Sequence, residues 1–265
     1  MCLTFFKQKS ALNAYEEHAP AIAMSDADHI PLEIMQGGGT LKTWKMPEGT
    51  QRAEMAFKTN GRPLSAMVEL LIGPIRKTHT INIKNQDGAI SPYKACLKFK
   101  PGPWTIRITN TGPYEFPMEA GLAVADSVKN KEIEERTLTM FKNADRVLLQ
   151  GGDSKSKGGQ VHSFPIDANV KSVNVIGWSG NLSKIKKGMK IKIEATKGPN
   201  EPRQSYDLHC GGSTQPYHCI IQTPGSGWTL RIWSKNVVEY PCEVAVVPHE
   251  VDDSVDPTAA VTSPW

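Results

Sequence analysis

An internal duplication constrains the fold of this chain more than any other feature of its sequence. Residues 92–124 and 216–248 align without gaps at a constant spacing of 124 residues, and nine of the 33 positions are identical. Both blocks contain the pattern W-T-x-R-I, followed downstream by an aromatic residue, Pro, a variable residue and Glu. A match of this length predicts two copies of one structural unit. The identical pairs are Pro92/Pro216, Tyr93/Tyr217, Trp104/Trp228, Thr105/Thr229, Arg107/Arg231, Ile108/Ile232, Glu115/Glu239, Pro117/Pro241 and Glu119/Glu243.

The similarity continues upstream of these blocks with gaps, which sets the expected organisation of the chain. Three segments of the first unit match the second: Thr40–Trp44 with Gln160–Phe164, Ala53–Phe57 with Val173–Gly177, and Ile81–Ile83 with Ile191–Ile193. We therefore expect five parts: an N-terminal arm (1–39), repeat 1 (40–124), a linker with a short helix (125–159), repeat 2 (160–247) and an acidic C-terminal arm (248–265).

Apolar and polar residues alternate with a period of two inside each repeat. This period is typical of strands that bury one face and expose the other. Turn-forming pairs such as Asn60-Gly61 and Asp87-Gly88 separate the strands. The predicted fold is all-β with a minor α component: two tandem, related antiparallel β-sandwich-like domains. The alternation predicts a repeated core of Trp104, Ile106, Ile108, Trp228, Leu230 and Ile232.

The segment Asp126–Leu149 is the best helix candidate, with Asp126 or Ser127 as its N-cap. Its apolar positions follow a helical stripe only in part. A short helix followed by a strand is an equally good interpretation.

Composition excludes several classes of protein. The net charge is +4 and the body is only mildly basic, whereas a nucleic-acid binder usually has a denser basic stripe. No apolar run approaches the roughly 18 residues of a membrane span. Five cysteines, an odd number with no C-x-x-C pair, favour a reducing compartment. The first ten residues lack the apolar core of a secretory signal.

Two groups of residues have a chemical interpretation as well as a structural one. The adjacent pairs His209-Cys210 and His218-Cys219 are the densest group of soft ligands, but neighbouring strand residues point to opposite faces, so each pair offers one ligand. Glu115, Glu119, Glu239 and Glu243 could serve as paired acids in glycoside hydrolysis. We expect them instead to form ion pairs with Arg107 or Arg231. No metal, cofactor or catalytic residue is expected.

Two surfaces are candidates for assembly. Trp233 lies out of phase with the core alternation and is expected to face outward, near a lysine-rich strand with Lys186, Lys190 and Lys192. The acidic tail is either disordered or an extended arm that adds to the sheet edge of a neighbouring molecule. Its apolar residues, which a purely solvated tail does not need, fit the arm better. Its candidate contact residues are Val251, Asp252, Asp253, Val255 and Trp265.

The duplicated blocks, with P-Y, G-P-W-T-I-R-I and Y-E-F-P-M-E in the first and P-Y, G-W-T-L-R-I and V-E-Y-P-C-E in the second, resemble the diatom pyrenoid shell proteins. The resemblance spans about residues 40–247. It implies a non-enzymatic protein that self-assembles into a sheet around the Rubisco-rich pyrenoid of the plastid and supports CO2 concentration and carbon fixation. It also implies a stromal location at the pyrenoid periphery, after removal of a presequence, with Rubisco or other pyrenoid proteins as further partners.

Two other functions remain open at this stage. The first is a carbohydrate- or protein-binding β-sandwich, or a coat-like virion protein, that uses Trp233 and the lysine face. The second is a hydrolase that uses the repeated glutamates.

Overall fold

The structure, a computed structural model, describes residues 30–73, 76–100, 102–152, 159–179, 188–198, 202–211, 215–237 and 240–258. Sixteen strands and one helix occupy these residues, which confirms the prediction of an all-β fold with a minor α component. The first eight strands are β1 (Leu32–Met35), β2 (Leu41–Lys45), β3 (Arg52–Lys58), β4 (Leu64–Ile72), β5 (Arg76–Asn85), β6 (Tyr93–Lys98), β7 (Trp104–Asn110) and β8 (Met118–Val124). After helix α2 (Ser127–Asn143) come β9 (Val147–Leu149), β10 (Val161–Pro165), β11 (Val170–Trp178), β12 (Met189–Lys197), β13 (Pro202–Cys210), β14 (Tyr217–Gln222), β15 (Trp228–Ser234) and β16 (Cys242–Val251).

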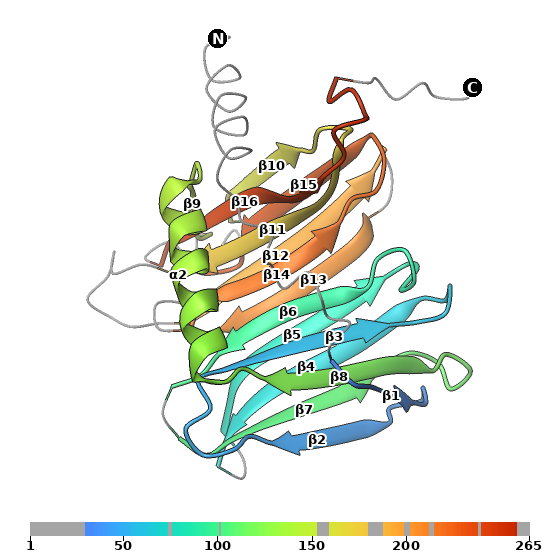
Figure 1. The fold of residues 1–265 in the computed structure, drawn as a ribbon, viewed down its shortest axis with the longest axis vertical. Coiled ribbons are helices and arrows are strands. Elements are labelled where there is room, and N and C mark those ends of the chain that lie inside the picture. The colour runs from blue at the N-terminus through green and yellow to red at the C-terminus, as the bar shows by residue number, and fades with distance from the viewer. Residues whose placement is uncertain are drawn as a thin grey trace.

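The strands form two eight-stranded sheets, and each sheet contains strands of both repeats (Figure 1). Sheet A has the order β1-β8-β3-β6-β14-β11-β16-β9, and sheet B has the order β10-β15-β12-β13-β5-β4-β7-β2. The repeats join where β6 pairs with β14 and where β5 pairs with β13, both antiparallel. The second half of each sheet repeats the first half in reverse order, so the two repeats are related by an approximate two-fold axis through these junctions.

The strand order extends the duplication beyond the part that the sequence alignment covers. β1 lies within the predicted N-terminal arm and pairs with β8, while β9 lies within the predicted linker and pairs with β16. The two strands therefore occupy equivalent places, and each repeat has eight strands.

One of the three upstream alignments is wrong. Ile191–Ile193 lies in β12, whose equivalent in repeat 1 is β4, whereas Ile81–Ile83 lies in β5. Val68 of β4 lies opposite Ile108 and Ile193 of β12 lies opposite Ile232, so Val68 and Ile193 are equivalent. The error arose because β4 and β5 both alternate apolar and polar residues, so pattern alone does not tell one from the other.

The core lies between the two sheets, and its centre explains why Tyr93 and Tyr217 are identical in the two repeats. Both rings are fully buried, and their hydroxyl oxygens are 3.0 Å apart. Ala95 and Cys219, two residues further on, lie opposite each other in the β6–β14 pair. The approximate two-fold axis therefore passes between the tyrosines, and one residue type supplies both partners of the hydrogen bond. The six predicted core residues with the W-T-x-R-I pattern are all buried.

Helix α2 confirms the second of the two interpretations of residues 126–149, a short helix followed by a strand. The Asp126 carboxylate accepts hydrogen bonds from the backbone N–H groups of Val128 and Lys129, which satisfies donors that the first turn leaves unpaired. The helix packs on the outer face of sheet A through Ile133, Met140 and Phe141. Because these side chains contact strands of both repeats, α2 fastens the repeats together.

Candidate interaction surfaces

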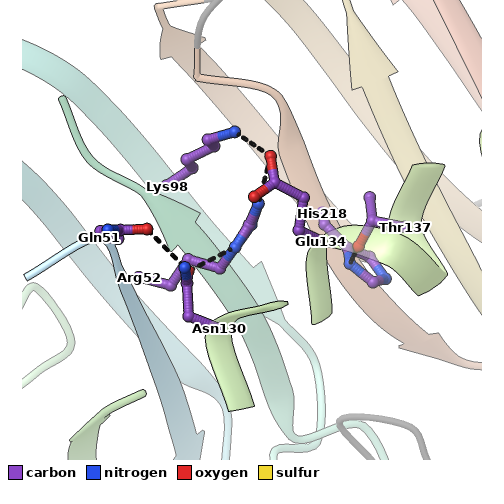
Figure 2. A network of polar contacts seen from close by, with 7 residues as sticks. All are labelled: Gln51, Arg52, Lys98, Asn130, Glu134, Thr137 and His218. Atoms are coloured by element: carbon purple, nitrogen blue, oxygen red, sulfur yellow. Dashed lines mark hydrogen bonds and ion pairs between the residues drawn. The ribbon is translucent and has the colours of Figure 1, made fainter. Parts of the chain in front are cut away.

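The contact between α2 and sheet A contains a network of charged and amide side chains (Figure 2). Arg52 on β3 is buried, and its Nε donates to Asn130 Oδ1 on the helix over 3.0 Å. Asn130 in turn donates to Gln51 over 2.5 Å. Glu134 accepts from Lys98 on β6 over 2.7 Å and lies 3.6 Å from the guanidinium of Arg52. Buried charges require such partners, so this network fixes the position of α2 on repeat 1.

On repeat 2, His218 of β14 holds the same helix. Its Nε2 lies 3.0 Å from Asn174 Oδ1 and its Nδ1 lies 3.4 Å from the hydroxyl of Thr137 on α2. Because Asn174 Oδ1 can only accept, Nε2 carries the proton and Nδ1 accepts from Thr137. Burial, followed by the nearby cation of Arg136, lowers the pKa of His218 to about 3. His218 is therefore a neutral structural residue.

The His-Cys pairs do not assemble a metal site. Cys210 and Cys219 are buried, and burial raises the pKa of the Cys219 thiol to about 12. His218 is engaged with Asn174 and Thr137, as described above. Among the residues that the structure describes, no group of three or more His, Cys, Asp or Glu side chains could hold a metal ion.

The outer face of sheet B carries no helix in the described part of the chain, and ion pairs cross it. Arg107 on β7 pairs with Glu69 on β4, and Lys77 contacts the same carboxylate. Burial alone would raise the pKa of Glu69, but hydrogen bonds from Lys77 and Arg107 lower it below the ordinary value. In repeat 2, Glu194 lies opposite Arg231 at the equivalent position.

The expectation that the repeated glutamates pair with these arginines is wrong for Glu119 and Glu243, while Glu239 lies outside the described residues. Glu119 pairs with Lys58 at 3.4 Å, and Glu243 lies 3.9 Å from Arg146. The partner of Arg107 comes from the neighbouring strand β4, which lies far upstream in the sequence. A repeated Glu69/Glu194 would have indicated this partner, but the incorrect alignment of β4 and β5 hid that equivalence.

A shallow groove of about 750 Å³ crosses the β5–β13 junction on the same face. Its charged lining contains both signs, with Lys84 and Lys192 beside Glu194 and Asp207. Lys192 pairs with Glu194 at 2.7 Å, and Lys235 pairs with Asp207 at the edge of the groove. The charged groups are thus largely compensated by one another.

Trp233, Lys190 and Lys192 lie on this face, as the alternation predicts. The Trp233 side chain is half-buried, and Lys192 Nζ lies 5.0 Å from the centre of its ring. Trp233 also lies opposite Val161 of the edge strand β10. Lys186 lies outside the described residues.

The candidate contact residues of the tail divide into two groups. Val251 ends β16, lies opposite Val170 and packs against the core of its own molecule. Asp252 forms an ion pair with Lys171 at 2.7 Å, and hydrogen bonds from Lys171 and Ser254 lower its pKa to about 2. The first residues of the predicted C-terminal arm therefore belong to the sandwich. Asp253 and Val255 are exposed, and Trp265 lies outside the described residues.

A second repeated motif, outside the alignment with a spacing of 124 residues, lies at the two ends of the molecule. Gln36-Gly37-Gly38 follows β1 and Gln150-Gly151-Gly152 follows β9. A Cβ atom on Gly37 would collide with the carbonyl oxygen of Pro113, and one on Gly151 with that of Val237. Only glycine allows the backbones to approach so closely. The two copies of this motif are 114 residues apart, whereas the longer match has a spacing of 124. A search for short repeats at other spacings would have identified the motif.

No helix among the described residues is long and apolar enough to cross a membrane.

A family model described as "Diatom pyrenoid shell protein" matches residues 26–248, which is most of the chain and includes both repeats. No curated protein matches the chain in sequence. Among solved structures, one similar chain belongs to Sulfolobus turreted icosahedral virus, with 13% identity, a TM-score of 0.21, and 83% of this chain and 90% of that chain covered. Another is the tandem CBM22-1–CBM22-2 domain of Xyn10C from Paenibacillus barcinonensis, with 9% identity, a TM-score of 0.23, and 84% and 92% covered.

Proposed function

The chain belongs to the diatom pyrenoid shell protein family, and from this membership we propose that it is a structural protein that assembles with copies of itself into a sheet around the pyrenoid. The single observation that carries the proposal is the family match over residues 26–248, which covers both repeats. The sheet encloses the Rubisco condensate and supports CO2 concentration and carbon fixation. Its residues act by contact between molecules rather than by catalysis.

The shape of the molecule supports a role in a thin layer. The two stacked sheets make a slab whose faces differ, because α2 covers part of sheet A and no described helix covers sheet B (Figure 1). A layer of equally oriented slabs would have two chemically different sides. We propose that one side faces Rubisco or other pyrenoid proteins, in the stroma of the chloroplast after removal of a presequence.

We also propose that the tail beyond Thr258 reaches a neighbouring molecule through Trp265. Residues up to this point are attached to their own sandwich, because Ala168 N–H donates to the carbonyl of Pro257 over 3.2 Å. A truncation after Thr258 therefore keeps this attachment and removes Trp265. We expect the truncated chain to stay folded and to assemble at a higher concentration than the full chain, and Trp265→Ala to shift the threshold in the same direction. If both variants assembled at the same concentration as the full chain, the tail would not contribute to assembly.

Localisation in diatom cells tests the proposed function. A fluorescently tagged chain should form a shell around the Rubisco signal inside the chloroplast, and its depletion should raise the external CO2 concentration needed for half-maximal photosynthesis. A tagged chain distributed through the Rubisco interior, or located outside the chloroplast, would contradict the proposal.

A further inference from the structure

The slab ends at two pairs of edge strands, one pair from each repeat. We call the edges of β1 and β2 end 1, and the edges of β9 and β10 end 2. In the described residues the strand order of sheet A stops at β1 and β9, and that of sheet B stops at β2 and β10. An edge strand offers unpaired N–H and C=O groups to any strand that approaches it, so proteins usually protect edges with charged residues, proline or short strands.

Some of these features are present, because β1 and β9 are only four and three residues long and β2 carries Lys42 and Lys45. The edges nevertheless also carry exposed apolar side chains at equivalent positions. Ile34 on β1 is 73% exposed and its equivalent Leu148 on β9 is 47% exposed. Leu41 on β2 and Val161 on β10 are 51% and 47% exposed.

The register confirms that these residues correspond. Ile34 lies opposite Glu119, and Leu148 lies opposite Glu243, which is the repeat partner of Glu119. Exposed apolar residues that are duplicated at both ends mark surfaces that lose contact with water in a complex.

The direction of the strands decides how two copies would meet. Every neighbouring pair in sheet A and in sheet B is antiparallel, and each sheet has eight strands. With an even number of antiparallel strands, the two edge strands of a sheet run in opposite directions. A copy shifted along the slab without rotation therefore brings its β9 antiparallel to β1, and its β10 antiparallel to β2.

We propose that end 1 of one molecule binds end 2 of the next, so that copies of this chain join head to tail into rows with continuous sheets. This inference rests on the proposed self-assembly and assigns it a surface. Ile34 and Leu41 of one copy bury their side chains against Leu148 and Val161 of the neighbour. One head-to-tail contact is enough to extend a row without limit, because copies related by a shift without rotation cannot close into a ring. Pairing of like ends would need two separate self-complementary surfaces.

Single charge substitutions at either end test the proposal. Ile34→Asp disables end 1 and Leu148→Asp disables end 2, while Val128→Asp on α2 is the matched control because Val128 is 65% exposed and lies at neither end. Assembly is followed by sedimentation velocity and negative-stain electron microscopy, and folding by the thermal unfolding midpoint. We expect each end variant to raise the concentration threshold for assembly at least tenfold, and the control to match the wild type. Leu41→Asp and Val161→Asp repeat the test on sheet B, in case one substitution on sheet A prevents folding.

Mixing the two end variants distinguishes the proposed contact from its alternatives. Ile34→Asp keeps a working end 2 and Leu148→Asp keeps a working end 1, so an equimolar mixture should form discrete dimers that neither variant forms alone. Dimers of one variant alone would show pairing of like ends and overturn the proposal. Wild-type-like assembly of both variants, as when residues 1–29 cover end 1, would overturn it while leaving self-assembly intact. A wild-type chain that never assembles overturns the proposed function and this inference together.

Discussion

At the scale of single residues, the duplication places two equivalent tyrosines side by side at the centre of the molecule. Tyr93 and Tyr217 share one hydrogen bond inside a core that water does not reach. A buried hydroxyl that loses its partner costs about 1–3 kcal/mol, whereas removing both partners together costs less than the sum of the two single changes.

We therefore expect Tyr93→Phe and Tyr217→Phe each to lower the free energy of unfolding by about 1–2 kcal/mol, and the double variant to cost no more than either alone. Urea unfolding of the three variants gives the coupling energy. Tyr114→Phe is the control, because Tyr114 is largely exposed and its removal should change stability by less than about 0.5 kcal/mol. Additive losses for the two tyrosines would show that their hydroxyl groups do not interact.

His218 gives the molecule a pH dependence whose sign follows from its burial. Its pKa is about 3 in the folded chain and near 6.5 when unfolded, so the unfolded chain binds more protons and stability is lost as the pH falls below 6.5. His79, with a pKa near 4, contributes in the same direction. Between pH 6 and pH 5 we expect His218→Gln to reduce the slope of unfolding free energy against pH by about 1 kcal/mol per pH unit. An unchanged slope would mean that His218 is not buried in its neutral form.

At the scale of elements, α2 shows both what the sequence predicts and what it leaves open. Asp126 marks the start of the helix correctly, because capping is a local interaction between a side chain and the next few N–H groups. The face of sheet A on which the helix packs depends on residues such as Arg52 and His218, which are far from it in sequence, and no local pattern identifies them. The same reason explains the missed strand β1, which is short and is revealed only by its pairing with β8.

The charge of Glu134 should matter for the attachment of α2. Glu134→Gln leaves Lys98 and the buried Arg52 without their carboxylate, and we expect a loss of about 1–2 kcal/mol in unfolding free energy. Glu135→Gln is the matched control, one residue away and exposed, with an expected change within about 0.5 kcal/mol. Equal effects of the two substitutions would show that the network does not hold the helix.

At the scale of the whole molecule, the period of two and the W-T-x-R-I blocks were sufficient to predict an all-β fold with a duplicated core. They did not predict that each sheet would continue through both repeats. The β5–β13 and β6–β14 pairings join residues more than 100 positions apart. The alternating pattern of these strands does not specify which strand lies beside them. Trp233 and Val251, the candidates for assembly, were also predicted only in part. Alternation predicts the face of the sheet on which a residue lies, but it does not predict whether other residues of the same molecule cover that side chain.

Separating the repeats should therefore expose the junction strands. We expect chain 1–124, expressed alone, to aggregate or to remain largely unfolded, because β5 and β6 lose their partners β13 and β14 and become long open edges. Circular dichroism and size-exclusion chromatography of this half, compared with the full chain, measure the effect. A stable, monomeric half would show that each repeat is an independent domain, as the sequence alone had suggested.

In the proposed function, this chain builds a layer from copies of itself. The most direct test is electron microscopy of the purified chain across a concentration series, with sedimentation of the same samples. We expect sheets or tubes above a threshold concentration, with a wall about 30 Å thick, which is the thickness of two sheets about 10 Å apart with side chains and one helix outside. A chain that remains monomeric at every concentration would contradict the proposed function.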